Sequence, residues 1–299
     1  MHTPTPAAAP ERARGALIGA LVGDAWGRPY EGTAVSDAAR ILAEFARRRD
    51  APGTLGHSDD GEMTLALLES LQFDGALDQE HFVRLMSFTH EPARGYGKGV
   101  RSVFRAVRGR VPWQEATTSF WVDGSRGNGA AARVASVAAL HAGASEAHVV
   151  ELARRSAVVT HAHPEAVDGA VVIAVATHAA VRTAERAAVT DAATRHAGSL
   201  VSVVAQVGAL RDSTPAEVAR QIGNDVLASR SVGSALWALH TSASFEGAII
   251  NALSLGGDTD TIACMTGAIA GGFYGADAIP TSWQLALEPE ARRTLARVP

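Results

Sequence analysis

The chain has 299 residues, of which 47% are hydrophobic and 19% are charged, so it can bury a core of the size found in helical enzymes. Its formal net charge of −4 does not supply the broad basic surface that nucleic-acid binding requires, so nucleic acid is not an expected partner. Cys264 is the only cysteine, which excludes an intrachain disulfide and suits a reducing compartment.

The first residues do not read as an export signal. Residues 1–11 lack a basic leader followed by an apolar core, and their spaced prolines predict a flexible tail before a single domain over residues 12–299. The longest apolar run, residues 171–176, is far shorter than the roughly 20 residues of a membrane span. We therefore expect a monomeric, cytoplasmic protein without a membrane partner.

Apolar residues recur at helical spacing between Gly and Pro breaks, and the sequence does not contain alternating runs flanked by hairpin turns. An all-α fold is predicted. Helices are expected over residues 12–21, 61–72, 79–90, 97–108, 130–141, 146–158, 164–182, 215–222, 232–239, 245–253 and 261–274. Segments 171–181 and 262–272 are apolar nearly all round, which predicts central helices. Residues 182–214 show little sustained helical period.

Residues 23–32 contain Gly and Pro breaks, so they are expected to form a loop after the first helix. This loop carries Asp24 and Glu31. Loops of this kind can act as lids, although either acid could equally be a solvated turn carboxylate.

Two acidic segments stand immediately before predicted helices: Ser58-Asp59-Asp60, and Gly256-Gly257-Asp258-Thr259-Asp260-Thr261. Each could simply cap its helix, because Asp, Ser and Thr satisfy free backbone N–H groups there. Together they supply more oxygen atoms than capping needs, and an oxygen-only set suits a hard divalent cation. Four carboxylates would repel one another unless protons or metal ions compensate. Two metal ions that activate water for hydrolysis are the simpler explanation.

The segment Gly124-Ser125-Arg126-Gly127-Asn128-Gly129 precedes the helix predicted at residue 130. Small residues there can expose backbone N–H groups to a phosphate, although a plain linker between helices would look the same. The segment Gly95–Gly99 is equally ambiguous. His161 and His163 do not have the spacing of a helical metal pair, and on their own they fit capping or core histidines.

These segments, in this order, resemble the ADP-ribosylglycohydrolases, most closely the serine-directed animal members, over nearly the whole chain. The resemblance rests on Gly23-Asp24 with Tyr30-Glu31, Ser58-Asp59-Asp60 with Met63, Arg94-Gly95-Tyr96-Gly97, Gly124-Ser125 with Gly127-Asn128-Gly129, Thr160-His161, residues 254–263 and 267–271, Tyr274-Gly275, Pro280 and Ser282-Trp283-Gln284.

The resemblance implies a compact orthogonal bundle of α-helices with two Mg²⁺ ions, or Mn²⁺ in some relatives, in a cleft for ADP-ribose. Glu31 matches a mobile-loop glutamate with a general-base or gating role, so Glu31 and Asp60 are the candidate catalytic residues. The implied metal ligands are Ser58, Asp59, Asp60, Asp258, Asp260 and Thr261. The implied ADP-ribose contacts are Gly97, Phe120, Gly124, Ser125, Arg126, Gly127, Asn128, Gly129 and His161.

Three positions depart from the family pattern. Ser58 replaces a Thr but keeps a ligating hydroxyl, and Gly61 replaces a second Thr after the paired aspartates. Arg126 stands where the serine-directed animal members have an aromatic residue, so either a guanidinium plane covers adenine there or adenine is hardly covered at all.

From the resemblance we expect a metal-dependent hydrolase that acts on ADP-ribosylated proteins or small acceptors. The favoured bond is O-linked, as in ADP-ribosyl-serine, O-acetyl-ADP-ribose or poly-ADP-ribose. An ADP-ribosyl-arginine hydrolase is the first alternative, and a catalytically silent ADP-ribose-binding or structural protein on the same scaffold is the second. A helical phosphohydrolase is disfavoured, because Ser58 separates His57 from Asp59 and breaks the His-Asp doublet of that type.

Overall fold

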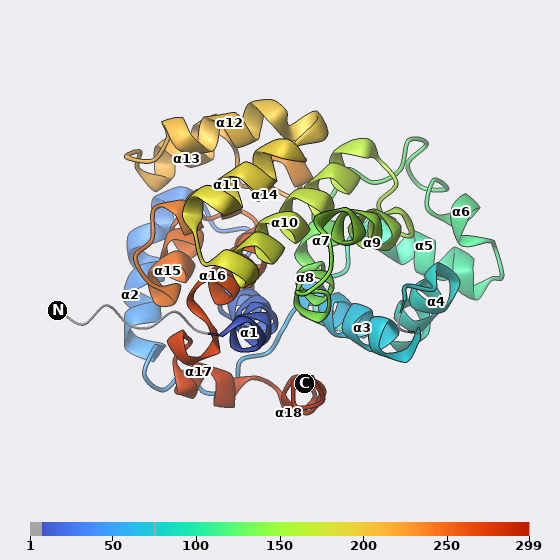
Figure 1. The fold of residues 1–299 in the computed structure, drawn as a ribbon, viewed down its shortest axis with the longest axis horizontal. Coiled ribbons are helices and arrows are strands. Elements are labelled where there is room, and N and C mark those ends of the chain that lie inside the picture. The colour runs from blue at the N-terminus through green and yellow to red at the C-terminus, as the bar shows by residue number, and fades with distance from the viewer. Residues whose placement is uncertain (1–7, 75, 299) are drawn as a thin grey trace.

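In the computed structural model, which describes residues 8–74 and 76–298, the chain is built from helices (Figure 1). Extended backbone within these residues pairs only in three isolated bridges, which confirms the predicted all-α class. The α-helices are α1 (Ala9–Gly27), α2 (Ala38–Arg48), α3 (Asp59–Asp74), α4 (Gln79–Thr89), α5 (Lys98–Arg108), α6 (Trp113–Ala116), α7 (Gly129–Ala132), α8 (Ala135–Leu140), α9 (Glu146–Val158), α10 (Pro164–Thr183), α11 (Arg186–Arg195), α12 (Val201–Ala209), α13 (Pro215–Gln221), α14 (Ala228–His240), α15 (Phe245–Ser254), α16 (Thr259–Tyr274), α17 (Thr281–Ala286) and α18 (Pro289–Leu295). Short 3₁₀-helices are η1 (Arg28–Tyr30), η2 (Val35–Asp37), η3 (Pro92–Arg94), η4 (Gly198–Leu200) and η5 (Ala276–Ala278).

The helices expected from the sequence are present, with some differences. The segment expected as one helix over residues 130–141 is divided into α7 and α8, and residues 182–214 contain α11 and α12. The sequence prediction also lacked α2, α6, α17 and α18. Most of the predicted tail, residues 1–7, lies outside the described residues, while α1 already begins at Ala9.

Helix α10 crosses the middle of the molecule and packs against α7, α9, α11 and α16 (Figure 1). By length and composition alone α10 could cross a membrane, but 83% of its most apolar window is buried inside the protein. Even its polar residues Thr177 and His178 are buried. The helix therefore supplies the interior of the bundle, as predicted for a central helix.

Helices α1 and α16 pack with their backbones in direct contact. A Cβ atom on Gly23 would lie 2.0 Å from the carbonyl oxygen of Ala263, and one on Gly27 would lie 2.4 Å from the Cα of Asp260. Only glycine fits at such a separation, so this contact sustains α1 through residues that favour a loop. The expected loop is therefore wrong in its first half, and Asp24 lies inside a helix beside the start of α16.

Helix α2 is anchored by two apolar residues one turn apart, Ile41 and Phe45, while most of its other side chains remain at the surface. The Phe45 ring packs against Trp26 of α1 and Trp283 of α17, with ring centroids 4.6 and 5.5 Å apart. This aromatic cluster holds the chain that follows Glu31 against the rest of the bundle.

Candidate active site

A cavity of about 680 Å³ opens between the starts of α3 and α16 and the loops around residues 95–99 and 121–128. Its volume suits a nucleotide-sized ligand. Of the residues selected from the sequence, those that line this cavity are Glu31, Asp59, Asp60, Gly97, Gly124, Ser125, Arg126, Gly127, Asn128, Gly129, His161, Asp258, Asp260 and Thr261. The fold thus brings nearly all of the candidate residues to one place.

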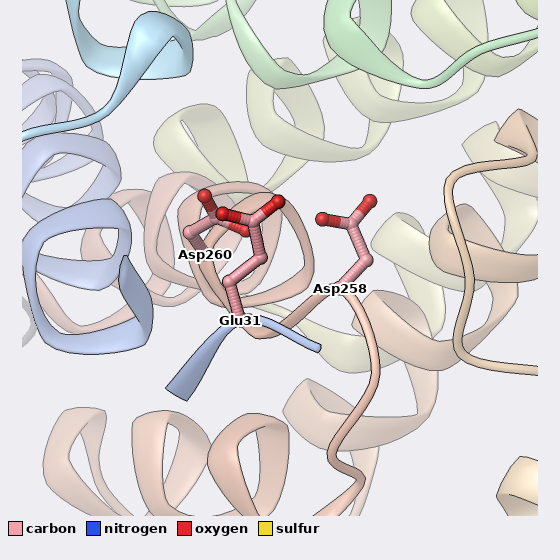
Figure 2. Close-up of side chains that lie close together, drawn as sticks. All are labelled: Glu31, Asp258 and Asp260. Atoms are coloured by element: carbon pink, nitrogen blue, oxygen red, sulfur yellow. The ribbon is translucent and has the colours of Figure 1, made fainter. Parts of the chain in front are cut away.

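Three carboxylates converge in this cavity. Figure 2 shows Glu31, Asp258 and Asp260 with their carboxyl groups side by side. One oxygen of each lies within 4.8 Å of those of the other two, and Glu31 is exposed while both aspartates are buried. Carboxylates at this spacing repel one another unless protons or a cation lie between them, so the spacing fits a divalent cation.

Backbone pairing explains why Glu31 lies beside α16. The N–H of Gly32 donates to the carbonyl of Gly257, and the N–H of Gly257 donates to the carbonyl of Thr33, both at 2.7 Å. Gly257 has φ of 69°, and a Cβ atom there would lie 2.1 Å from the carbonyl oxygen of Asn224. Glycine at residues 256 and 257 therefore lets two distant segments meet at the acidic cluster.

Asp59 and Asp60, at the start of α3, line the same cavity. Together with Glu31, Asp258 and Asp260 they form an acidic wall. Burial, followed by the charge of Asp24, raises the pKa of Asp59 to about 8. Burial and then Asp59 raise the pKa of Asp60, and burial and then Asp258 raise that of Asp260. These ligands are all oxygen atoms, and their negative charges are poorly compensated by the surroundings. Such a group of ligands suits hard divalent cations such as Mg²⁺.

Asp24 has a different place from the solvated loop position expected for it. It is fully buried, and its carboxylate accepts hydrogen bonds from the N–H of Ser58 at 2.8 Å, the Ser58 hydroxyl at 2.6 Å and the N–H of Gly61 at 3.0 Å. A Cβ atom on Gly61 would lie 2.5 Å from an Asp24 oxygen. In this structure the glycine leaves room for the Asp24 carboxylate, which fixes the turn that presents Asp59 and Asp60.

Ser58 and Phe120, both predicted from the sequence as site residues, are described by the structure but do not line the cavity. The Ser58 hydroxyl donates to Asp24 and accepts from the N–H of Asp60 at 3.1 Å, so it is engaged beneath the acidic wall. Trp121 lines the cavity in place of Phe120, and the two rings pack edge to face with centroids 4.9 Å apart. Trp121 is therefore the aromatic residue that a ligand would meet, and the sequence analysis did not select it.

The loop over residues 124–129 is tied to its surroundings by its own polar groups. The N–H of Gly127 donates to the Ser125 hydroxyl, and the N–H of Asn128 donates to the carbonyl of Val226, both at 3.1 Å. These two N–H groups therefore already have acceptors, so the anion cradle expected from the sequence is only partly available. The Asn128 side chain donates to Asp258 at 2.5 Å and joins this loop to the acidic cluster.

Arg126 lies at the rim of the cavity, where its Nε donates to Glu165 at 2.8 Å. Glu165 also accepts a hydrogen bond from the Ser229 hydroxyl. The guanidinium group is thus held at the position where the resemblance places adenine contacts, and its plane remains able to stack on a base.

A polar clamp that the sequence did not reveal holds the segment before the acidic wall. The guanidinium groups of Arg28 and Arg94 both donate to the carbonyl oxygen of His57 at 2.8 Å. Glu288 accepts from Arg94 at 2.8 Å and lies 2.7 Å from the His57 ring nitrogen Nδ1. Because Arg28 precedes Glu31 and His57 precedes Ser58, this clamp fixes two site segments relative to each other.

The helical bundle and the cleft of carboxylates define a class of hydrolase that uses metal ions to act on a nucleotide-sized substrate. The family model for ADP-ribosylglycohydrolase matches residues 5–298, and the chain belongs to this family. The family predicted from the sequence is therefore confirmed. This family is metal-dependent and acts on ADP-ribosylated substrates, so the general activity of the chain is the hydrolytic removal of ADP-ribose.

The chain is 32% identical to ADP-ribosylhydrolase ARH3 of Mus musculus and to that of Homo sapiens, with 93% of this chain and 87% and 89% of those proteins covered. It is 28% identical to ADP-ribosyl-[dinitrogen reductase] glycohydrolase of Rhodospirillum rubrum, over 96% of this chain and 94% of that protein. A solved structure described as an ADP-ribosylglycohydrolase-related protein complex superposes with a TM-score of 0.71 at 24% identity and covers 96% of both chains. The last similarity shows the fold.

Proposed function

We propose that this protein is a Mg²⁺-dependent hydrolase, with Mn²⁺ as a possible substitute ion, that releases ADP-ribose from O-linked acceptors. ADP-ribosyl-serine, O-acetyl-ADP-ribose and the links within poly-ADP-ribose are the candidate substrates. The observation that carries the proposal is the convergence of Glu31, Asp258 and Asp260 within 4.8 Å, in a cavity large enough for a nucleotide. The resemblance to the serine-directed members of the family, on the residues given in the sequence analysis, favours the O-linked class.

Asp59, Asp60, Asp258, Asp260 and Thr261 are the side chains that would hold two cations. Bound cations would supply positive charge that orients the hydroxyls of the distal ribose and lowers the pKa of water. The Thr261 hydroxyl donates to Asp258 at 3.1 Å and orients its carboxylate. The donor set thus fits the proposed ions in both charge and chemistry.

In the proposed reaction, the oxygen of a water molecule attacks the anomeric carbon of the distal ribose. The bond from this carbon to the acceptor oxygen breaks, and the acceptor oxygen gains a proton while the water gives one up. Burial and then Asp258 raise the pKa of Glu31, which makes this carboxylate a better base than a free glutamate. We assign Glu31 the role of accepting the proton from water, and Asp60 the role of orienting that water beside the ribose.

Matched peptides that carry serine-linked or arginine-linked ADP-ribose test this proposal. Release of ADP-ribose is followed with Mg²⁺, with Mn²⁺ and with excess chelator. Release from the serine-linked peptide alone, abolished by chelator, is the expected result. Release from the arginine-linked peptide alone would replace the proposal with the arginine-directed alternative. Tight ADP-ribose binding without release from either peptide would indicate a silent binding protein.

A further inference from the structure

Arg133 is a buried cation close to the active site. It lies between α7 and α8, its side chain is fully buried, and its Nη1 donates to the Thr160 hydroxyl oxygen at 2.9 Å. The same guanidinium group donates to the carbonyl of Ser156 and contacts the Met63 sulfur at 3.5 Å. Because a guanidinium group has only donors, the Thr160 oxygen must act as an acceptor in this contact.

The Thr160 hydroxyl has one hydrogen to donate and one partner left for it. Within residues 8–74 and 76–298, its oxygen makes hydrogen bonds with Arg133 Nη1 and with His161 Nδ1, the latter at 2.8 Å. Thr160 is only 1% exposed, so solvent does not offer an alternative acceptor. The hydroxyl hydrogen therefore points to His161 Nδ1, which must be the unprotonated nitrogen of the ring.

The other ring nitrogen of His161, Nε2, then carries the proton, and it lies beside the loop over residues 124–129. A Cβ atom on Gly127 would be 3.3 Å from His161 Nε2, and both residues line the cavity. Burial, followed by the charge of Arg133, lowers the pKa of His161 to about 3, so the ring is neutral near neutral pH. His161 is thus a neutral side chain with an N–H group beside residues 124–129.

We propose that Arg133 and Thr160 are positioning residues that fix His161 in its Nε2–H tautomer, so that the ring donates a hydrogen bond to a ligand oxygen beside the 124–129 loop. The ligand oxygen belongs to a phosphate or a ribose hydroxyl, because an N–H donor requires an acceptor of this kind. The identity of the ligand as ADP-ribose rests on the proposed function. The tautomer itself follows from the hydrogen bonds alone.

The tautomer can be read directly in the ligand-free protein by long-range ¹H–¹⁵N NMR of the histidine rings. Wild-type His161 is expected to be protonated at Nε2 and unprotonated at Nδ1. In Thr160→Val the hydroxyl is lost, so the ring is expected to populate both tautomers and ADP-ribose affinity to fall about tenfold, as for the loss of one hydrogen bond. Thr160→Ser keeps the hydroxyl, so it is expected to restore the single Nε2–H tautomer and the wild-type affinity. Thr177→Val, which alters an equally buried threonine of α10, is the matched control and should change neither.

Protonation of wild-type His161 at Nδ1 would overturn the inference, whatever the stability of the variants. The same holds if Thr160→Val keeps both the wild-type tautomer and the wild-type affinity. Because the tautomer is measured without ligand, it decides the inference separately from the proposed function. Failure of the wild-type protein to bind ADP-ribose would contradict the proposed function, while the Nε2–H signal would still support the tautomer assignment.

Discussion

Replacement of Asp24 tests whether this buried carboxylate organises the acidic wall. Asp24→Ala leaves the backbone N–H groups of Ser58 and Gly61 without their acceptor in a fully buried position. Each orphaned group costs about 1–1.5 kcal/mol at the low end of the usual range, so we expect a loss of about 2–3 kcal/mol in the free energy of unfolding. The turn that carries Asp59 and Asp60 should loosen, and the affinity for Mg²⁺ should fall with it.

The measurement is urea unfolding in chelator at pH 5. Burial raises the pKa of Asp24 to about 6, so at this pH the side chain is mostly neutral in the folded protein and the cost of a buried charge is small. Asp212→Ala removes an exposed carboxylate and serves as the control, with an expected change within about 0.5 kcal/mol. An equally small change in Asp24→Ala would refute our account and favour the solvated loop carboxylate expected from the sequence.

Four further outcomes are expected. Asp260→Ala should abolish turnover and weaken Mg²⁺ binding measured by calorimetry; full activity would refute the metal-site assignment. Glu31→Gln should lower turnover while ADP-ribose affinity stays within about twofold, and an unchanged rate would exclude its role as base. Gly23→Ala should destabilise the protein by about 1–3 kcal/mol in urea unfolding, because its Cβ meets Ala263; wild-type stability would show that α1 and α16 can separate freely. In chelator, thermal stability should fall as pH rises from about 4 to 8. The pKa of Asp59 is raised to about 8 in the folded protein, so over this range the folded state binds more protons than the unfolded state. Mg²⁺ should restore stability near pH 8. A pH-independent midpoint in chelator would contradict that sign.

The helices that the sequence predicted share one property, a sustained recurrence of apolar residues at helical spacing. Helix α11 lacks it, because its buried face consists of Val189, Ala192 and Ala193, and small side chains give a weak periodic signal. The C-terminal part of α1, residues 22–27, was missed for another reason. Its glycines argue against a helix by intrinsic propensity, and the helix continues because those glycines contact the backbone of α16. That contact joins residues far apart in the sequence, so local patterns could not reveal it.

The residues of the candidate site show the same difference between local patterns and long-range packing. Asp59, Asp60, Asp258 and Asp260 could be selected because each acidic pair stands directly before an apolar helix, a local pattern, and the structure places all four at one cavity. The residues that orient them required knowledge of the packing. Asp24 reaches Ser58 only because α1 passes behind the start of α3, and neighbouring loop residues gave no sign that Trp121, rather than Phe120, turns inward.

These supporting contacts bear on how firmly the acidic cluster is held. Asn128 fixes one oxygen of Asp258, Asp24 fixes the turn that carries Asp59 and Asp60, and the paired glycines bring Glu31 into range. Asp258, the turn before α3 and Glu31 are thus each held by groups from a distant part of the chain. Mutual repulsion would otherwise drive such a cluster apart, so the fold keeps the carboxylates close at a cost in stability that bound cations would offset. The packing of α1, α3 and α16 therefore preorganises the acidic cluster, which is why its geometry depends on contacts far along the sequence.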